Sequence, residues 1–176
     1  MERAYQVAFN RRVLINEFLP DTQTLGRGVV VGATGWEQQL EANKQTYFNQ
    51  LVTRPEFLSL YSSLTNAPYV DALNANTGGS LTTADRDALV NGLGSGTETR
   101  ATVLRKVSEN ATFSQREFNR AFVLMEYFGY LRRNPDESGF QFWLNKLNAF
   151  NGDFRAAEMV KAFITSFEYR GRFGSP

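Results

Sequence analysis

The chain has 176 residues, of which 42% are hydrophobic and 14% aromatic, with 19 Lys or Arg against 18 Asp or Glu. This length suits one ordinary domain or a few small repeats that share a core. The balanced charge argues against a nucleic-acid partner, because such binding needs a concentrated basic face. The chain has no Cys and no His, which excludes disulfides, thiolate zinc sites and a Ser-His-Asp triad. We therefore expect a protein that is not an enzyme and that needs no cofactor.

Helical patterns begin near the N-terminus and are interrupted by a glycine-rich stretch. Apolar residues keep helical spacing from Ala4 to Phe18. We expect Pro20 to end this helix, because proline cannot continue the hydrogen-bond ladder. The segment between Asp21 and Gly35 is rich in glycine, and we interpret it as a loop packed on the core. Its valines could form a short strand, but a lone strand has no ladder partner.

Residues that favour helix starts divide the rest of the chain. Thr34 and Glu37 have the spacing of a capping box. Pro55 fits the first turn of a helix, where its missing N–H costs nothing. Asp136 or Ser138 is expected to cap a later helix. No apolar run reaches the ~20 residues that span a bilayer, so we expect no membrane insertion.

The most regular pattern lies between Ala121 and Leu147, where two amphipathic runs meet at a turn containing Pro135. Residues 116–132 are predicted to form the longest helix, and residues 154–167 carry the last strong apolar stripe. The residues expected in the structural core share places on these and earlier apolar stripes: Trp36, Leu40, Leu89, Leu93, Phe122, Phe128, Trp143, Leu147, Val160 and Phe163. We expect both tryptophan side chains to be mostly buried.

Three segments of the chain align with one another, at a repeat length of about 50–60 residues. The alignment pairs Trp36 with Trp143, although chance matches at helical spacing are an alternative explanation. Repeated helical units bury their faces against their neighbours, which favours binding over chemistry. We predict an all-α fold, a single helical domain over residues 1–176. It is a bundle of about three degenerate repeats of two or three helices, at approximately 4–62, 66–115 and 116–174.

A turn that starts at Asn134 resembles the first half of a calcium-binding loop. It has oxygen donors at the first, third and fifth positions and glycine at the sixth, so that Asn134, Asp136 and Ser138 are candidate metal ligands. The twelfth position holds Asn145 instead of the bidentate Glu of that motif, and Pro135 limits how tightly the backbone can wrap. The alternative is a turn in which Asp136 caps the next helix. We expect this alternative, and no calcium site.

The C-terminal segment also carries a family pattern. Leu131, Pro135-Asp136, Gly139 and Trp143 have the spacing Leu-x-x-x-Pro-Asp-x-x-Gly-x-x-x-Trp, and a later helix ends at Ser166-Phe167-Glu168-Tyr169. Over residues 118–174 the chain resembles a bacterial domain of unknown function, number four-two-one-four, and the two earlier repeats match less closely.

The resemblance has one departure and one extension. The family pattern begins Leu-Gly-Arg, whereas Arg132 stands at the glycine position here, so the resemblance does not fix the geometry of this turn. The ending, followed by Phe173-Gly174, is also similar to the phycobilisome linker domain, a helical module that bridges other proteins.

The resemblance implies a helical, non-catalytic module of large bacterial proteins, located outside the cell or in the cell envelope, often beside calcium-binding repeats. We therefore expect a protein–protein interaction or scaffolding module that is the C-terminal fragment of a larger protein. Its partner would be another protein or a second copy. The alternative is a carbohydrate-binding or carbohydrate-active domain that uses exposed tryptophan and loop carboxylates. Exposed tryptophan rings beside carboxylates would favour the alternative.

Overall fold

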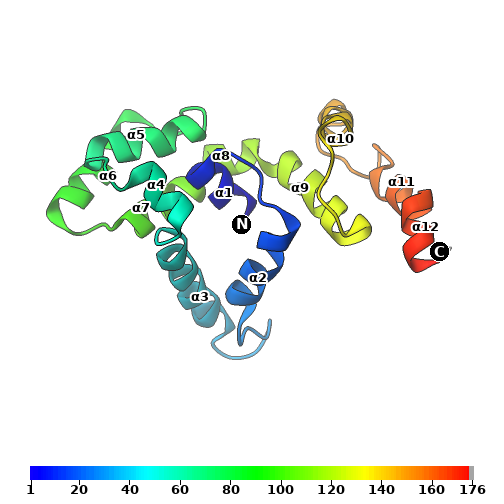
Figure 1. Cartoon of the computed structure of the whole chain (residues 1–176), viewed down its shortest axis with the longest axis horizontal. Coiled ribbons are helices and arrows are strands. Elements are labelled where there is room, and N and C mark those ends of the chain that lie inside the picture. Colours follow the sequence, from blue (N-terminus) through cyan, green and yellow to red (C-terminus); the bar gives the residue numbers. More distant parts are fainter. Residues whose placement is uncertain (175–176) are drawn as a thin grey trace. The chain divides into compact units, whose positions relative to one another are not determined.

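The computed structural model describes residues 1–174, whose regular elements are all helices, with no strand in this range (Figure 1). The prediction of an all-α fold is confirmed. The described residues form two units, an N-terminal unit of Met1–Ser114 and a C-terminal unit that begins at Gln115. This boundary falls where the second predicted repeat meets the third. The repeat and the single domain stay predictions, and Ser175 and Pro176 lie outside the described residues.

The helices of the N-terminal unit are short, apart from one of 16 residues. Its elements are α1 (Glu2–Phe9), α2 (Ile15–Gly26), α3 (Trp36–Leu51), α4 (Pro55–Tyr61), α5 (Asn66–Asn76), α6 (Thr83–Ser95) and α7 (Arg100–Ser108). α8 (Ala111–Arg116) crosses the boundary between the units. The C-terminal unit contains α9 (Phe118–Glu126), a π-helical turn η1 (Tyr127–Leu131), α10 (Glu137–Ala149), α11 (Met159–Thr165) and α12 (Phe167–Phe173).

The first predicted helix is in fact two helices. α1 ends at Asn10, whose φ of 51° is left-handed, and α2 continues past Pro20 to Gly26. The prediction that Pro20 ends a helix is therefore wrong. Proline removes one backbone donor, but the next residue, Asp21, is buried and bonded to Arg54. These tertiary bonds offset the missing helical bond.

The connection between α2 and α3 is shorter than predicted, because α2 includes residues 21–26. Asn43 donates hydrogen bonds to the Leu25 and Arg27 carbonyls at 2.9 and 2.8 Å, which fix its start. Val30 and Val31 are exposed, so the prediction that this loop packs on the core is wrong. The predicted capping box at Thr34 is also wrong, since the α3 N-cap is a glycine with φ 83° and no side-chain bond.

α1 lies at the centre of the N-terminal unit, in contact with α4, α5 and α7 (Figure 1). Its residues Tyr5, Val7 and Ala8 have no exposed surface. Phe57 of α4 packs edge-on against Tyr69 of α5, with the ring centroids 6.1 Å apart. Pro55 occupies the first turn of α4, as predicted. The interior is thus closed by aromatic rings, whose large buried area dominates the stability of such a core.

The C-terminal unit has no single long helix at residues 116–132, which corrects the prediction. α8 ends at Arg116 and α9 begins at Phe118, so the run is interrupted at Glu117, two residues beyond the boundary between the units. The last part of the run widens into the π-helical turn and stops at Arg132, which has a left-handed φ of 51°. α11 is likewise shorter than its predicted stripe. The Ser166 hydroxyl accepts the Tyr169 N–H and starts α12, so the two helices cannot be continuous.

The ten residues predicted for the core divide into two groups. Four are buried: Leu89, Phe128, Leu147 and Phe163. The other six are only half-buried: Trp36, Leu40, Leu93, Phe122, Trp143 and Val160. Helical spacing identifies an apolar face, but it does not tell how far a neighbouring helix covers that face. For this reason both tryptophans lie at the margin of a core.

Candidate functional site

The candidate metal ligands meet in one turn, where they serve as a helix cap. The Asp136 Oδ1 atom accepts the Gly139 N–H at 2.7 Å and the Ser138 hydroxyl at 2.8 Å, as predicted for the N-cap of α10. These hydrogen bonds, that from Gly139 first, hold the pKa of Asp136 below its usual value. The Arg133 guanidinium lies 3.6 Å from the other carboxylate oxygen. Residues 1–174 contain no group of three or more metal-binding side chains of the Asp, Glu, His or Cys type. The expectation of no calcium site stays a prediction.

The close surroundings of Gly139 explain why the family pattern has a glycine at this position. A Cβ atom on this residue would lie 2.4 Å from the Tyr127 hydroxyl oxygen and 3.1 Å from both Asp136 carboxylate oxygens. Tyr127 is buried, so a shift of its side chain would disturb the residues packed around it. The Asp-x-x-Gly spacing therefore joins a helix cap to a close contact between α10 and the π-helical turn.

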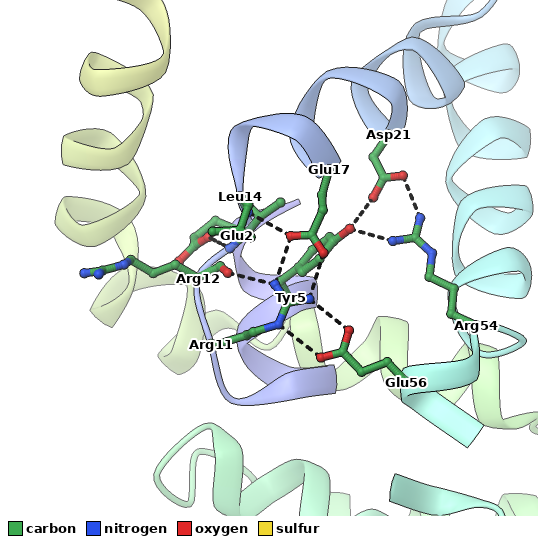
Figure 2. Close-up of polar contacts among 10 residues, drawn as sticks. Glu2, Tyr5, Arg11, Arg12, Leu14, Glu17, Asp21, Arg54 and Glu56 are labelled. Carbon is green, nitrogen blue, oxygen red and sulfur yellow. Dashed lines mark hydrogen bonds and ion pairs between the residues drawn. The ribbon is translucent and has the colours of Figure 1, made fainter. Parts of the chain in front are cut away.

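A partly buried polar cluster connects the first helices of the N-terminal unit (Figure 2). The Tyr5 hydroxyl donates to Asp21 at 2.9 Å. The Arg54 guanidinium donates to the Tyr5 oxygen at 2.5 Å and to Asp21 at 2.6 Å. Arg11 bridges the carboxylates of Glu17 and Glu56 at 2.7 and 2.9 Å.

The role of this cluster is structural, because its bonds hold separate helices together. Burial first, and then the charge of Asp21, raise the pKa of Tyr5 far above its usual value, so its hydroxyl stays neutral. Asp21, Glu17 and Glu56 are each paired with a guanidinium, and the buried carboxylate of Asp21 requires such a partner. Figure 2 shows that the partners come from α1, α2 and α4 and from the segments between them. No sequence motif joins positions so far apart, so this cluster could not be predicted from the sequence.

Aromatic rings of the C-terminal unit form a continuous row, which we call the aromatic seam. The ring centroids of consecutive members are 5.1, 5.4, 6.3, 6.1 and 4.9 Å apart. In order, the members are Phe142, Trp143, Phe163, Tyr130, Tyr169 and Phe173. These residues come from η1, α10, α11 and α12. Sequence analysis found Trp143 and Phe163 as core residues, but it did not predict the row.

The seam is buried in its middle and exposed at both ends. Phe163 is buried, whereas Phe142 and Phe173 are 59% and 51% exposed. Phe167, at the start of α12, is 96% exposed. Monomeric proteins rarely expose contiguous apolar patches larger than a few hundred Å², and such patches mark sites of interaction. The aromatic seam and its exposed Phe neighbours therefore form the candidate site.

A carboxyl group adjoins the seam. Glu126, the last residue of α9, is half-buried, and its Oε2 atom is buried with no hydrogen-bond partner among the described residues. Burial raises its pKa to about 7. After burial, the charge of Glu126 is the largest influence that raises the pKa of the seam residue Tyr130. An unpaired carboxyl beside a π-helical turn is a feature often found at functional sites.

The alternative of a sugar platform depends on Trp143. Its ring meets Phe142 edge-on, with an interplanar angle of 82°. The Lys146 ammonium lies over the same indole, 5.3 Å from the ring centroid. A sugar would have to displace this cation to stack on the indole. Trp36 belongs to the N-terminal unit, so each tryptophan is in a separate unit.

The comparisons with known proteins concern the C-terminal part of the chain. Residues 106–173 match the family model described as Domain of unknown function (DUF4214). This confirms the predicted family resemblance for that segment. No curated protein and no solved structure matches the chain. Within residues 1–174, every helix is too short or too polar to cross a membrane.

Proposed function

Because residues 106–173 match the DUF4214 family, we propose that this protein is a non-catalytic interaction or scaffolding module which binds another protein through the aromatic seam. The exposure of Phe142, Phe167 and Phe173 beside one row of rings supports this proposal. Aromatic side chains are enriched at protein interfaces, where a few of them supply most of the binding energy.

The location and the relation to linker proteins are part of the proposal. The family resemblance suggests a protein of the cell envelope or the extracellular space. The likeness of the Ser166–Tyr169 ending to the phycobilisome linker domain suggests that the chain bridges other proteins. A carbohydrate-binding function is the second candidate, since Phe142 and the half-buried Trp143 could offer a surface to a sugar.

The test is capture of a partner by the purified chain from an extract of the native cell envelope. A protein retained in fixed stoichiometry should lose affinity by about tenfold or more when Phe142 and Phe167 are changed to Ser, since interface aromatics contribute about 2 kcal/mol or more. The matched control is Val30→Ser with Val31→Ser, which removes exposed apolar side chains from the N-terminal unit.

The outcomes separate the two candidates. If the seam variants and the control bind the captured protein equally well, the seam is not the interface. If polysaccharide fractions bind and Trp143→Ala abolishes this binding, the carbohydrate function replaces the proposed one.

A further inference from the structure

A cation stands between two exposed phenylalanines at each end of the aromatic seam. On α10, Lys146 lies four residues after Phe142, and four residues before Phe150, which is the C-cap of this helix, so the three follow one side of α10 and its end. On α12, Arg170 lies three residues from both Phe167 and Phe173. All four phenylalanines are exposed. Together with Phe118, these four are the exposed large apolar residues of the described C-terminal unit.

Two carboxylates near the seam are paired with cations, and the charge of a third is reduced. Glu168 of α12 is held by Arg133 at 2.8 Å and by Arg172 at 3.3 Å. Glu158 pairs with Lys161 at 3.1 Å. Burial raises the pKa of Glu126 to about 7, so this carboxyl is partly uncharged near neutral pH.

The cations, by contrast, are available. Arg170 is exposed and has no ion-pair partner among residues 1–174. Lys146 contacts the indole of Trp143, and its charge also helps Lys161 to lower the pKa of Glu158. The residues from 115 onward carry nine Lys or Arg and seven Asp or Glu. The C-terminal unit therefore carries a small positive net charge, and cations beside its exposed phenylalanines favour a negatively charged partner.

We propose that the aromatic seam binds an acidic amphipathic helix of a partner protein, whose apolar side chains cover the exposed phenylalanines and whose carboxylates pair with Lys146 and Arg170. This inference rests on the proposed function and adds the chemistry of the partner.

The spacing on α10 favours a helical partner. Residues eight positions apart in an α-helix are separated by about 12 Å along its axis, which places Phe142 and Phe150 two turns apart with Lys146 between them. A helix that lies alongside presents apolar side chains at the same two-turn interval. A carboxylate on its middle turn would then meet the ammonium group. Complementary charge of this kind fixes register and selects against wrong partners.

The experiment uses two labelled helical peptides of about 18 residues as probes. Both have the same leucine face, and their polar face is built from Glu in one and from Lys in the other. Fluorescence anisotropy measures the affinity of each for the full chain. We expect the acidic peptide to bind about tenfold tighter or more at ~0.05 M salt, and this preference to shrink at ~0.5 M salt.

Charge-reversal variants connect this preference to the seam. Lys146→Glu and Arg170→Glu should each reduce or reverse the preference for the acidic peptide. Arg27→Glu makes the same change of charge at an exposed site of the N-terminal unit and should leave the preference intact. Thermal unfolding of each variant shows whether it is folded.

The proposal of an acidic partner helix is overturned if both peptides bind equally or if the basic peptide binds more tightly. It is also overturned if the preference for the acidic peptide survives both charge reversals. The absence of binding by either peptide, or self-association in sedimentation with no peptide bound, would also overturn it. If both peptides bind equally but Phe142→Ser weakens both, the acidic partner is wrong and the seam remains an interaction surface.

Discussion

The two units of this chain both bury aromatic rings, but they differ in the large apolar residues that they leave exposed. In the N-terminal unit, Tyr5, Phe57 and Tyr69 are sealed inside, and the large apolar residues left exposed are all leucines and valines. In the C-terminal unit, the exposed large apolar residues are all phenylalanines. A buried ring stabilises the fold, whereas an exposed ring gains nothing until a partner covers it. The comparison teaches that aromatic content alone does not distinguish a core from a binding surface.

The largest difference in stability should appear when one aromatic ring is removed from each unit in turn. Phe57→Ala removes a fully buried ring and should lower the free energy of unfolding by about 3–5 kcal/mol. Phe167→Ala removes a ring with 96% of its surface exposed and should change it by less than ~0.5 kcal/mol. Chemical denaturation of the two variants measures both values. Comparable losses would show that the contrast between the units is wrong.

A smaller effect is expected from the close contact inside the C-terminal unit. Gly139→Ala places a Cβ atom 2.4 Å from the Tyr127 hydroxyl oxygen, and overpacking of this kind costs about 1–3 kcal/mol. The double variant with Tyr127→Phe removes the clashing oxygen and should recover part of the loss. The melting temperatures of both variants give the answer. If Gly139→Ala is as stable as the parent, the packing between α10 and Tyr127 is loose enough to accept the added methyl group, and the prediction is wrong.

The carboxyl beside the seam makes stability depend on pH. Because burial raises the folded-state pKa of Glu126 to about 7, above the ordinary ~4.3 of an unfolded chain, the folded state keeps its proton longer. Its contribution is fully present below pH ~4.3 and is lost as the pH rises to about 7. Glu126→Gln should lack this loss and be more stable than the parent at pH 8 by about 1 kcal/mol, after allowance for solvent screening.

The measurement for Glu126 is a series of denaturation curves from acid to mildly basic pH. Glu168→Gln serves as the comparison, since the hydrogen bonds from Arg133 lower the pKa of that carboxyl. Glu168→Gln should be less stable than the parent at neutral pH, an effect opposite in sign to that of Glu126→Gln. Parallel pH profiles for the parent and Glu126→Gln would mean that Glu126 is solvated like a surface residue.

The smallest effect concerns the backbone. Arg132 has a left-handed φ of 51°, a conformation that costs a residue with a Cβ about 1–2 kcal/mol. Arg132→Gly removes this cost but adds freedom to the unfolded chain, so a net gain of about 0.5 kcal/mol is expected. Arg133→Gly, one residue later, should instead destabilise, since it removes the ion pair with Glu168. A loss of stability in Arg132→Gly would show that its side chain has a role of its own.

Sequence reasoning succeeded where local chemistry determines structure. The helical class, the proline at the start of α4 and the Asp136 cap are all set by residues within a few positions of one another. The family pattern also located Gly139, whose role in packing became clear only from the contact with Tyr127.

The failures have a common physical cause, which is contact between distant positions. Pro20 does not stop α2, because Asp21 is bonded to Arg54, more than thirty residues away. The half-burial of Trp143 and the exposure of Phe142 depend on how α11 and α12 lie against α10 and the π-helical turn. The pattern of one helix contains no information about where its neighbours end. A candidate binding surface is therefore harder to predict than a core.

The place of α7 bears on how this protein can be divided. The family match begins at residue 106, inside α7, yet α7 packs against α1 and α3 of the N-terminal unit. Val107 and Ser108 are both buried there. A fragment limited to residues 106–173 would contain only the end of α7, without the helices against which α7 packs. Val107 and Ser108 would then lose the neighbours that bury them. The compact C-terminal unit begins instead at Gln115, so the family match and this unit have different starting points.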